Sequence, residues 1–399
     1  MERVSALLFV VAAVLGLAVG SGRTAGKASA LAQPKTLAAV PGKVYAVAQS
    51  ARYVAWRGCD SVGVSDAGGR RLTTVRVPQS PAFGCQVLDA PSYGLIDHDI
   101  LAIIGTTVTW SKWGYGNSTD YAAFGAARIP SGHSVPSVLP SNLWIGDQSG
   151  PAGSYIVGPA SDGRVFLYGV TTIASDPSCT NEQLLNSACP LRTSGALWHV
   201  TDQLQRTRVT SMATTLIAFS GGQLALVPHT VGQPPDVSNG RLFRQPQPIV
   251  LLLRMAGGAR AGTVHLDGEP YALALSSKLG AALVGRRSTN PRVRITTPSR
   301  LEWFEPGRDS TARSLVVGAN AEALSVIGNR IIFREGQRIL AYSPGATKPT
   351  VIARAPVGSS LVGPAVSGSR LVWADYDVAT NVSHIRLLNL SPTSPTHRD

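Results

Sequence analysis

The chain has 399 residues, of which only 15% are charged, and it contains 41 glycines and 27 prolines. Glycine and proline are spread along the chain as turn residues, and so low a charged fraction argues against a protein built of exposed helices. Composition therefore favours an all-β protein. The formal net charge of +13 is compatible with an anionic partner, although solubility alone also explains it.

The N-terminus has the order of a secretory signal. A charged start precedes an apolar run from Leu7 to Gly20, and small residues follow. The run is about 14 residues long, which is short for a helix that spans a bilayer. We expect residues 1–32 to be a signal peptide cleaved after Ala30 or Ala32, so that the mature protein is secreted or associated with the cell envelope. An uncleaved N-terminal anchor, and with it a membrane association, is the alternative.

Four cysteines in an exported chain fit two disulfides. Their spacing favours Cys59 with Cys85 and Cys179 with Cys189, although the sequence alone allows three pairings. No Cys-x-x-Cys motif is present, so the sequence supports neither a zinc knuckle nor a thioredoxin-type redox site.

A short unit recurs along the chain: a small turn, then a long polar residue, then a run of β-forming residues, most clearly from Ser367 to Trp373. The polar residues that mark the copies are Arg52, Asp99, Arg164, Gln223, Lys278, Arg330 and Arg370. The last two markers are about 40 residues apart, close to the ~40–45 residues of a four-stranded propeller blade, and the wider spacings need only loop insertions. Each marker is predicted to begin the second strand of a unit.

Closure into a ring explains how such units become stable. A lone blade would expose two apolar faces, whereas stacked blades bury one another around an axis. We expect a seven-bladed β-propeller of four-stranded antiparallel blades over residues 33–392, with six blades as the alternative count and 393–399 as a flexible tail. Because the seventh unit lacks a fourth strand, Lys35 to Val40 is predicted to pair with His384 to Leu390 and close the ring.

The order of turn, strand, strand, Pro-Gly turn and strand resembles the repeats of TolB-like and WD-repeat-like β-propellers over roughly Lys35 to Leu390. Ser161-Asp162-Gly163 stands where TolB-type repeats have Pro-Asp-Gly, and the Gly-His and Trp-Asp signatures of WD repeats are absent. The resemblance implies a fold and hardly constrains a function.

Insertions fall on one rim of the predicted ring. We call it the long-loop rim: it carries the segments between the second and third strands of each unit and those that link successive units. The opposite, turn rim carries the tight turns between first and second strands. Long second-to-third segments are predicted around Lys112–Asp120, Val170–Ser194, His229–Gln247 and Arg286–Ser299. Insertions gathered on one face are typical of binding faces in repeat proteins.

Two groups of candidate binding residues lie in these segments. Trp113 and Tyr115, placed where a loop begins, could stack on a sugar or another flat apolar ligand, or could pack between blades as expected for Trp110. Arg286, Arg287 and Arg292, with Arg294, suit phosphate or carboxylate groups, or form an ordinary solvated loop. Because aromatic residues do not flank these arginines, no nucleic-acid partner is expected.

No motif predicts a metal, a cofactor or a catalytic residue. Asp97-His98-Asp99 and Asp375-Tyr376-Asp377 alternate carboxylates but lack the further ligands of a calcium loop, and bonds from such carboxylates to local backbone amides are the simpler explanation. Four further histidines are isolated in sequence, with no His-x-x-x-His or His-x-His pair: His133, His199, His229 and His265. Neither a Gly-x-Ser-x-Gly elbow nor a phosphate-cradling loop is present.

The sequence thus favours an exported monomeric binding or scaffolding module, without a cofactor, that recognises an extracellular or envelope protein or an anionic or glycan polymer. The rival hypothesis is a propeller enzyme, a lyase or a glycoside-active enzyme, with residues distant in sequence meeting at the central axis.

Overall fold

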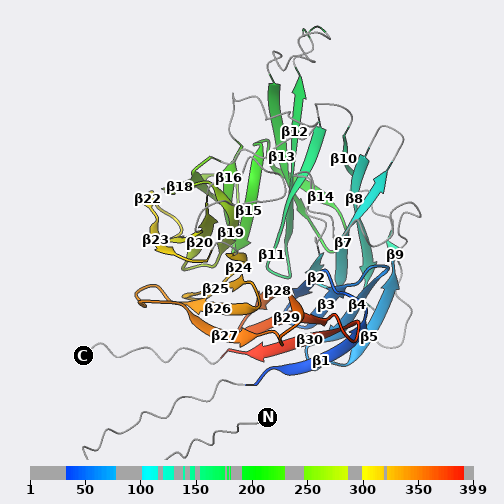
Figure 1. Ribbon diagram of the computed structural model, residues 1–399. Coiled ribbons are helices and arrows are strands. Elements are labelled where there is room, and N and C mark those ends of the chain that lie inside the picture. Colours follow the sequence, from blue (N-terminus) through cyan, green and yellow to red (C-terminus); the bar gives the residue numbers. More distant parts are fainter. Residues whose placement is uncertain are drawn as a thin grey trace, which may run out of the picture. The chain divides into compact units, whose positions relative to one another are not determined.

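The computed structural model describes residues 33–77, 101–115, 120–129, 138–139, 144–148, 153–175, 178, 180, 191–229, 247–285, 299–318 and 321–390. Every regular element among them is a β-strand (Figure 1). The strands form seven sheets, antiparallel in the order of their main strands, which are the blades.

Within each blade the strands are hydrogen-bonded in order from the first to the fourth. Blade one contains β2 (Ala46–Gln49), β3 (Tyr53–Arg57), β4 (Ser61–Asp66) and β5 (Arg71–Arg76). Blade two contains β6 (Leu101–Ile104), β7 (Thr107–Tyr115), β8 (Asp120–Arg128) and β10 (Trp144–Gln148), with β9 (Val138–Leu139) also on β8. Blade three contains β11 (Gly153–Ser161), β12 (Phe166–Ser175), β13 (Leu191–Val200) and β14 (Arg206–Thr210).

The second half of the chain continues this order. Blade four contains β15 (Thr214–Ser220), β16 (Gln223–Pro228), β17 (Ile249–Arg254) and β18 (Arg260–His265), with β22 (Ser310–Thr311) added in parallel. Blade five contains β19 (Pro270–Leu275), β20 (Gly280–Val284), β21 (Arg300–Phe304) and β23 (Arg313–Val316). Blade six contains β24 (Ala321–Ile327), β25 (Arg330–Glu335), β26 (Arg338–Tyr342) and β27 (Thr350–Arg354). Blade seven contains β28 (Ser359–Ser367), β29 (Arg370–Asp377), β30 (Val382–Asn389) and β1 (Lys35–Pro41).

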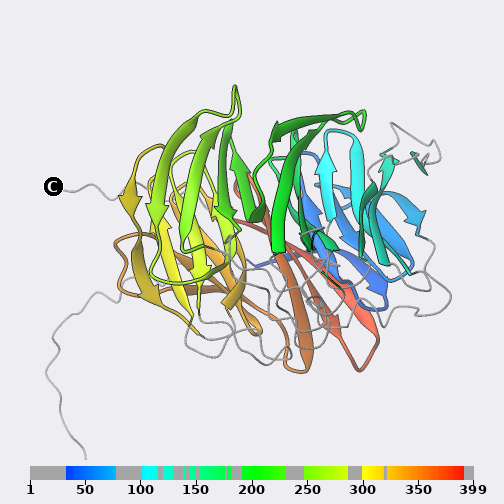
Figure 2. The ribbon, with the colours of Figure 1, turned by 90° about the horizontal axis from the view of Figure 1, so that it is seen from above.

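The first strands of the blades contact one another in a closed cycle that runs β2, β6, β11, β15, β19, β24, β28 and back to β2. They therefore surround the axis, and the fourth strands lie outermost. Neighbouring sheets stand face to face, as a view from above shows (Figure 2). The predicted seven-bladed propeller, the fold of TolB-like and WD-repeat-like proteins, is confirmed.

Stacking explains why the second strands are continuously apolar instead of alternating. In β25, Ile331 and Phe333 belong to the core shared with blade five, whereas Ile332 belongs to the core shared with blade seven. All three side chains are fully buried. A strand that packs on both faces has no solvent side, so its apolar run is unbroken.

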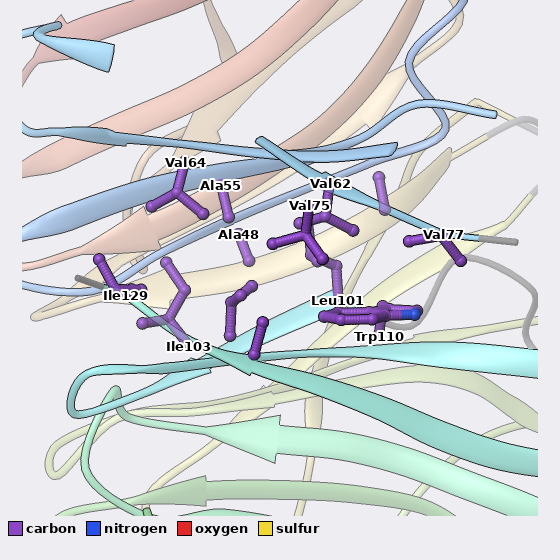
Figure 3. Packing of buried hydrophobic residues seen from close by; sticks show 13 residues of the cluster. Ala48, Ala55, Val62, Val64, Val75, Val77, Leu101, Ile103, Trp110 and Ile129 are labelled. Carbon is purple, nitrogen blue, oxygen red and sulfur yellow. The ribbon is translucent and has the colours of Figure 1, made fainter. Parts of the chain in front are cut away.

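The core between blades one and two shows the same packing at close range (Figure 3). Trp110 of β7 is 3% exposed and packs with Val62, Val75 and Leu101, so its predicted role in inter-blade packing is confirmed. A Cβ atom added to Gly125, which lies opposite Trp110 in β8, would sit only 2.3 Å from the indole nitrogen. The glycine is therefore required to seat the tryptophan.

The N-terminal strand closes the ring. β1 pairs antiparallel with β30, with Lys35 opposite Leu387 and Val40 opposite Ser383, as predicted (Figure 1). Leu37 of β1 is buried in the core that joins blade seven to blade one. Strands from the two ends of the described chain thus complete one sheet.

One predicted marker is wrong. The other six markers lie at the start of the second strand or in the turn just before it, but Leu101–Ile104 is β6, the first strand of blade two, and the second strand is β7. Both inner strands of a blade are buried, so both give the same apolar run. The tight turn at Gly105, whose φ is +55°, separates them.

Candidate functional site

The site residues were predicted to lie on the long-loop rim, of which the structure describes mainly the strand ends. The segments 78–100, 230–246 and 286–298 lie outside the described residues, and the strands that flank each of them end on this rim. Turns on the opposite rim are short by comparison, for example 221–222 and 328–329. The distribution of long connections that was predicted for blades four and five is confirmed.

Trp113 and Tyr115 are strand residues, which corrects their prediction as the start of a loop. β7 extends through Tyr115, and the two residues lie opposite Ala122 and Asp120 of β8. The β-forming sequence of this hairpin continues the strands beyond the expected end. Their side chains lie outside the described part of the structure, so their ligand role stays a prediction.

The second-to-third segment of blade three is likewise shorter than predicted. β12 continues to Ser175 and β13 begins at Leu191, with ten directly opposed pairs between them. Thr171 was predicted to lie in a loop, but it is a buried strand residue. Its hydroxyl donates to the carbonyl of Thr214 at 2.8 Å and accepts from the amide of Thr214 at 3.0 Å. Partnered in this way, a threonine in a strand can be buried.

Arg286, Arg287 and Arg292 lie in segment 286–298, outside the described residues, together with Arg294. Both anchors of that segment are described. The amide of Gly285 donates to the carbonyl of Glu269 at 3.0 Å, and the carbonyl of Ser299 accepts from the amide of Val317 at 2.8 Å. The arginine segment therefore leaves and rejoins blade five on the long-loop rim.

A group of polar residues lies between blades five and six, where the chain re-enters blade five after the arginine segment. The Tyr271 hydroxyl donates to the carbonyl of Ala321 at 2.9 Å and also interacts with Ser299, which is fully buried. Burial raises the pKa of Tyr271 to about 12. On the first strand of blade six, Glu322 pairs with Arg334 at 2.7 Å. The phenol remains neutral at physiological pH and acts as a fixed hydrogen-bond donor.

A second polar group stands between blades four and five. Glu302 is 1% exposed and accepts from the amide of Asp267 at 3.0 Å. The Asp267 carboxylate in turn pairs with Arg300 at 3.0 Å. Burial raises the pKa of Glu302, while the Asp267 amide and the Arg300 guanidinium oppose the rise. The carboxyl group thus holds the connection from blade four to blade five.

A second carboxylate has the same role as Glu302, one blade further on. Glu335 accepts from the amide of Gly318 at 2.6 Å and pairs with Arg338. Glu302 and Glu335 both bind a backbone amide of the preceding inter-blade connection. These described carboxylates of the rim are engaged by their own chain, which favours structural roles for them.

The described candidate metal groups have local partners. Asp377 accepts from the hydroxyl of Thr380 and the amide of Ala379, which lower its pKa, so the expected turn contact is confirmed for this residue. Asp375 pairs with Arg386. Asp97, His98, Asp99 and His133 lie outside the described residues. Within the described ranges, no three His, Cys, Asp or Glu side chains gather as metal ligands.

Cys59 lies in the turn between β3 and β4, on the long-loop rim, and it is disulfide-bonded. Its possible partners Cys85, Cys179 and Cys189 all lie outside the described residues. The pairing of Cys59 with Cys85 and of Cys179 with Cys189 stays a prediction.

The rim also carries apolar residues that sequence reasoning missed. Among the described residues, three large hydrophobic side chains are exposed: Val316 at 68%, Val357 at 100% and Val378 at 61%. Val316 ends the fourth strand of blade five, Val357 follows that of blade six, and Val378 lies between β29 and β30. All three therefore lie on the long-loop rim. A single valine in a turn is not a recognisable sequence pattern, so the sequence does not reveal that the three valines share a rim.

No family model and no curated protein matches the sequence. Similar solved structures include BamB from Moraxella catarrhalis, at 11% identity and a TM-score of 0.39, covering 88% of this chain and 85% of that one. The Pan2 WD40 domain of Neurospora crassa has 10% identity and a TM-score of 0.46, covering 88% and 94%. Hydrazine synthase of Kuenenia stuttgartiensis has 12% identity and a TM-score of 0.46, covering 88% and 96%. Similarity at this level bears on neither ligand nor activity.

None of the described segments forms a helix with the length and apolarity that a bilayer crossing needs. The predicted signal peptide, residues 1–32, lies outside the described residues.

Proposed function

We propose that the protein is an exported, non-catalytic binding module that holds a protein partner against its long-loop rim. One observation supports this proposal most. The large hydrophobic residues that are exposed in the described part of the chain all lie on this rim: Val316, Val357 and Val378. Isolated exposed apolar residues are common on proteins, but their restriction to one rim is typical of an interaction surface.

Burial of these side chains would give a partner a driving force. Removing a valine side chain from water stabilises a complex by about 1.5 kcal/mol or more. Polar groups at strand ends of the same rim, such as the Glu322–Arg334 pair, could form its hydrogen-bonded border. A protein surface with apolar side chains at its centre and polar groups around them would fit both features.

The predicted arginine segment would extend this surface. Arg286, Arg287 and Arg292 belong to a segment that starts and ends on the same rim as the three valines. Arginine is enriched in protein interfaces and pairs with carboxylates through two parallel hydrogen bonds. We therefore expect acidic side chains on the partner.

Export rests on the signal-like N-terminus and is supported by the disulfide at Cys59, because disulfides persist mainly in oxidising compartments. N-terminal sequencing of the mature protein tests this half of the proposal. We expect it to begin at Leu31 or Gln33. A mature protein that still begins at Met1 would contradict cleavage and favour the anchor.

Co-purification tests the binding half. The tagged mature protein is isolated from its native envelope fraction beside the variants Val357→Asp and Val378→Asp, and bound proteins are quantified by mass spectrometry. Both valines are exposed, so the variants are expected to fold. A buried unpaired carboxylate should lower partner recovery at least tenfold.

Ala51→Asp is the matched control, because Ala51 is exposed in the turn between β2 and β3 on the opposite rim. Its recovery of partner should equal that of the unchanged protein. Equal losses for Ala51→Asp and the rim variants, or undiminished recovery by both rim variants, would rule out the proposed face. The variant with Arg286, Arg287 and Arg292 all changed to Ser then tests the arginine segment.

A further inference from the structure

Blade three carries an exposed arginine pair beside a half-buried tryptophan, at the end of the blade opposite the long-loop rim. Trp198 of β13 lies opposite Arg208 of β14, and Val200 lies opposite Arg206. The guanidinium carbon of Arg206 stands 4.9 Å from the ring centroid of Trp198. Such a cation–π contact holds the guanidinium against the indole.

A second aromatic residue, Tyr168, lies near Arg206. Burial raises the pKa of Tyr168, a buried residue of β12 that lies opposite Trp198, and the nearby positive charge of Arg206 opposes that rise. The contact with Trp198 restrains the Arg206 guanidinium. Donors held in place lose less conformational entropy when an acceptor binds.

Positive charge is concentrated here. Arg206 and Arg208 are exposed, and neither forms an ion pair with a carboxylate in the described part of the chain. Arg128 of blade two donates to the side chain of Gln203 at 2.8 Å, in the turn that precedes β14. That turn also contains one acidic residue, Asp202.

Protection of a sheet edge is the simpler role for exposed arginines on outermost strands. Blade five shows what that role looks like. Trp303 and Arg313 lie opposite each other there, but the Trp303 ring packs against Tyr342 of blade six at 5.0 Å between centroids. In blade three, by contrast, an arginine stands over the ring itself.

We propose that the surface formed by Trp198, Arg206 and Arg208 binds the carboxylate groups of an acidic polysaccharide. A sugar carboxylate would accept two parallel N–H bonds from the Arg206 guanidinium, and the C–H face of the sugar would contact the accessible part of the indole. Arg208 would bind the carboxylate of a neighbouring sugar unit. This surface is separate from the proposed protein-binding rim.

Nucleic acid fits the same surface less well. A base stacks on an open aromatic face, and Arg206 already covers a face of Trp198. To stack on that face a base would have to displace the guanidinium, whereas a sugar acid binds the guanidinium itself.

The test measures Kd of the mature protein for polygalacturonate at 50 and 150 mM salt, with neutral dextran and oligodeoxythymidylate as comparison probes. Arg206→Gln and Arg208→Gln should each weaken polygalacturonate binding roughly tenfold, the loss expected for a charge-assisted bidentate contact. Trp198→Leu should weaken it as well. Because Arg208 is exposed, Arg208→Gln is expected to fold, so it tests the proposal even if another variant misfolds.

Arg313→Gln is the matched control. It removes the same charge from an outermost strand, beside Trp303, whose ring no arginine of the described residues covers. Its effect should stay below twofold. Equal losses for Arg313→Gln and Arg206→Gln would overturn the site, since net charge alone would then explain binding. Dextran bound as tightly as polygalacturonate, or oligodeoxythymidylate bound more tightly through the same residues, would also overturn it. The rim variant Val378→Asp should bind polygalacturonate normally, which separates this proposal from the protein-binding one.

Discussion

Arg386 of β30 and Asp375 of β29 form a bidentate ion pair, with Nε 2.9 Å from Oδ1 and Nη2 3.0 Å from Oδ2. Asp375 is buried, and the same guanidinium donates to the hydroxyl of Thr36 in β1. One arginine therefore links three strands of blade seven, including the N-terminal strand that closes the ring.

Asp375→Asn should lower the free energy of unfolding by about 3 kcal/mol, because it leaves a partly buried arginine without its charge partner. Urea denaturation measures the loss. Arg70→Gln is the control: it breaks the exposed pair with Asp66, which should be worth less than about 1 kcal/mol. Equal losses in the two variants would contradict a special role for the buried pair.

Deletion of residues 33–41 should lower the melting temperature and promote association. The deletion removes Leu37 from the core and leaves β30 with an unpaired edge, which invites pairing with another chain. Thermal unfolding and size-exclusion chromatography measure the two effects. Deletion of residues 393–399 serves as control, and a monomeric, equally stable 33–41 deletion would refute closure by β1.

As pH rises from 4 to 7, the free energy of unfolding of Glu302→Gln should increase relative to that of the unchanged protein. Burial raises the pKa of Glu302 in the folded state, so the folded protein binds this proton more tightly than the unfolded chain. Stability is therefore lost as pH rises from the ordinary glutamate pKa through the raised one, and glutamine removes that loss. Urea denaturation across this range checks the trend against Glu305→Gln, an exposed residue paired with Arg308. A difference independent of pH would contradict the assignment.

Tyr271→Phe should cost about 1 kcal/mol of unfolding free energy at pH 8, since the carbonyl of Ala321 loses its donor. The cost should shrink between pH 10 and pH 12. With the pKa of Tyr271 raised to about 12, the unchanged protein loses stability as pH climbs through that window, whereas phenylalanine does not titrate. Denaturation at pH 8, 10 and 11 measures the difference in unfolding free energy between the two proteins. A difference that grows above pH 10 would contradict a buried neutral phenol.

The fold could be predicted from sequence because its signal is repeated. The polar residue at the start of the second strand served as a marker for most blades, and the Arg370 side chain shows why such a position is structural. Its guanidinium donates to the carbonyls of Ser50 and Ala51 in the next blade, at 2.6 and 2.7 Å. A side chain that joins neighbouring blades recurs with the blades.

Blade two shows where the sequence-based prediction was wrong and which signal would have corrected it. Trp56 lies opposite Gly63 in blade one, as Trp110 lies opposite Gly125 in blade two, and each indole occupies the space of the missing Cβ atom. Aligning these two tryptophans would have identified β7 as the second strand. A single apolar run cannot distinguish the inner two strands, because both are buried.

The candidate site could be predicted only in outline. Long connections in the sequence indicated the rim, since a loop's length is visible without coordinates. The exposure of Val357 and Val378, the burial of Glu302 and the stacking of Arg206 on Trp198 all depend on neighbours from other strands. No local pattern encodes those neighbours.

Site-specific photo-crosslinking in the native envelope tests the proposed working face most directly. A photoreactive residue is placed at Val378 on the long-loop rim, and in a separate protein at Asn329, an exposed residue of the turn between β24 and β25 on the opposite rim. Crosslinking of a partner protein from position 378, with none from position 329, is the expected result. Capture of that partner from position 329 and not from 378 would show that the protein works through its other face.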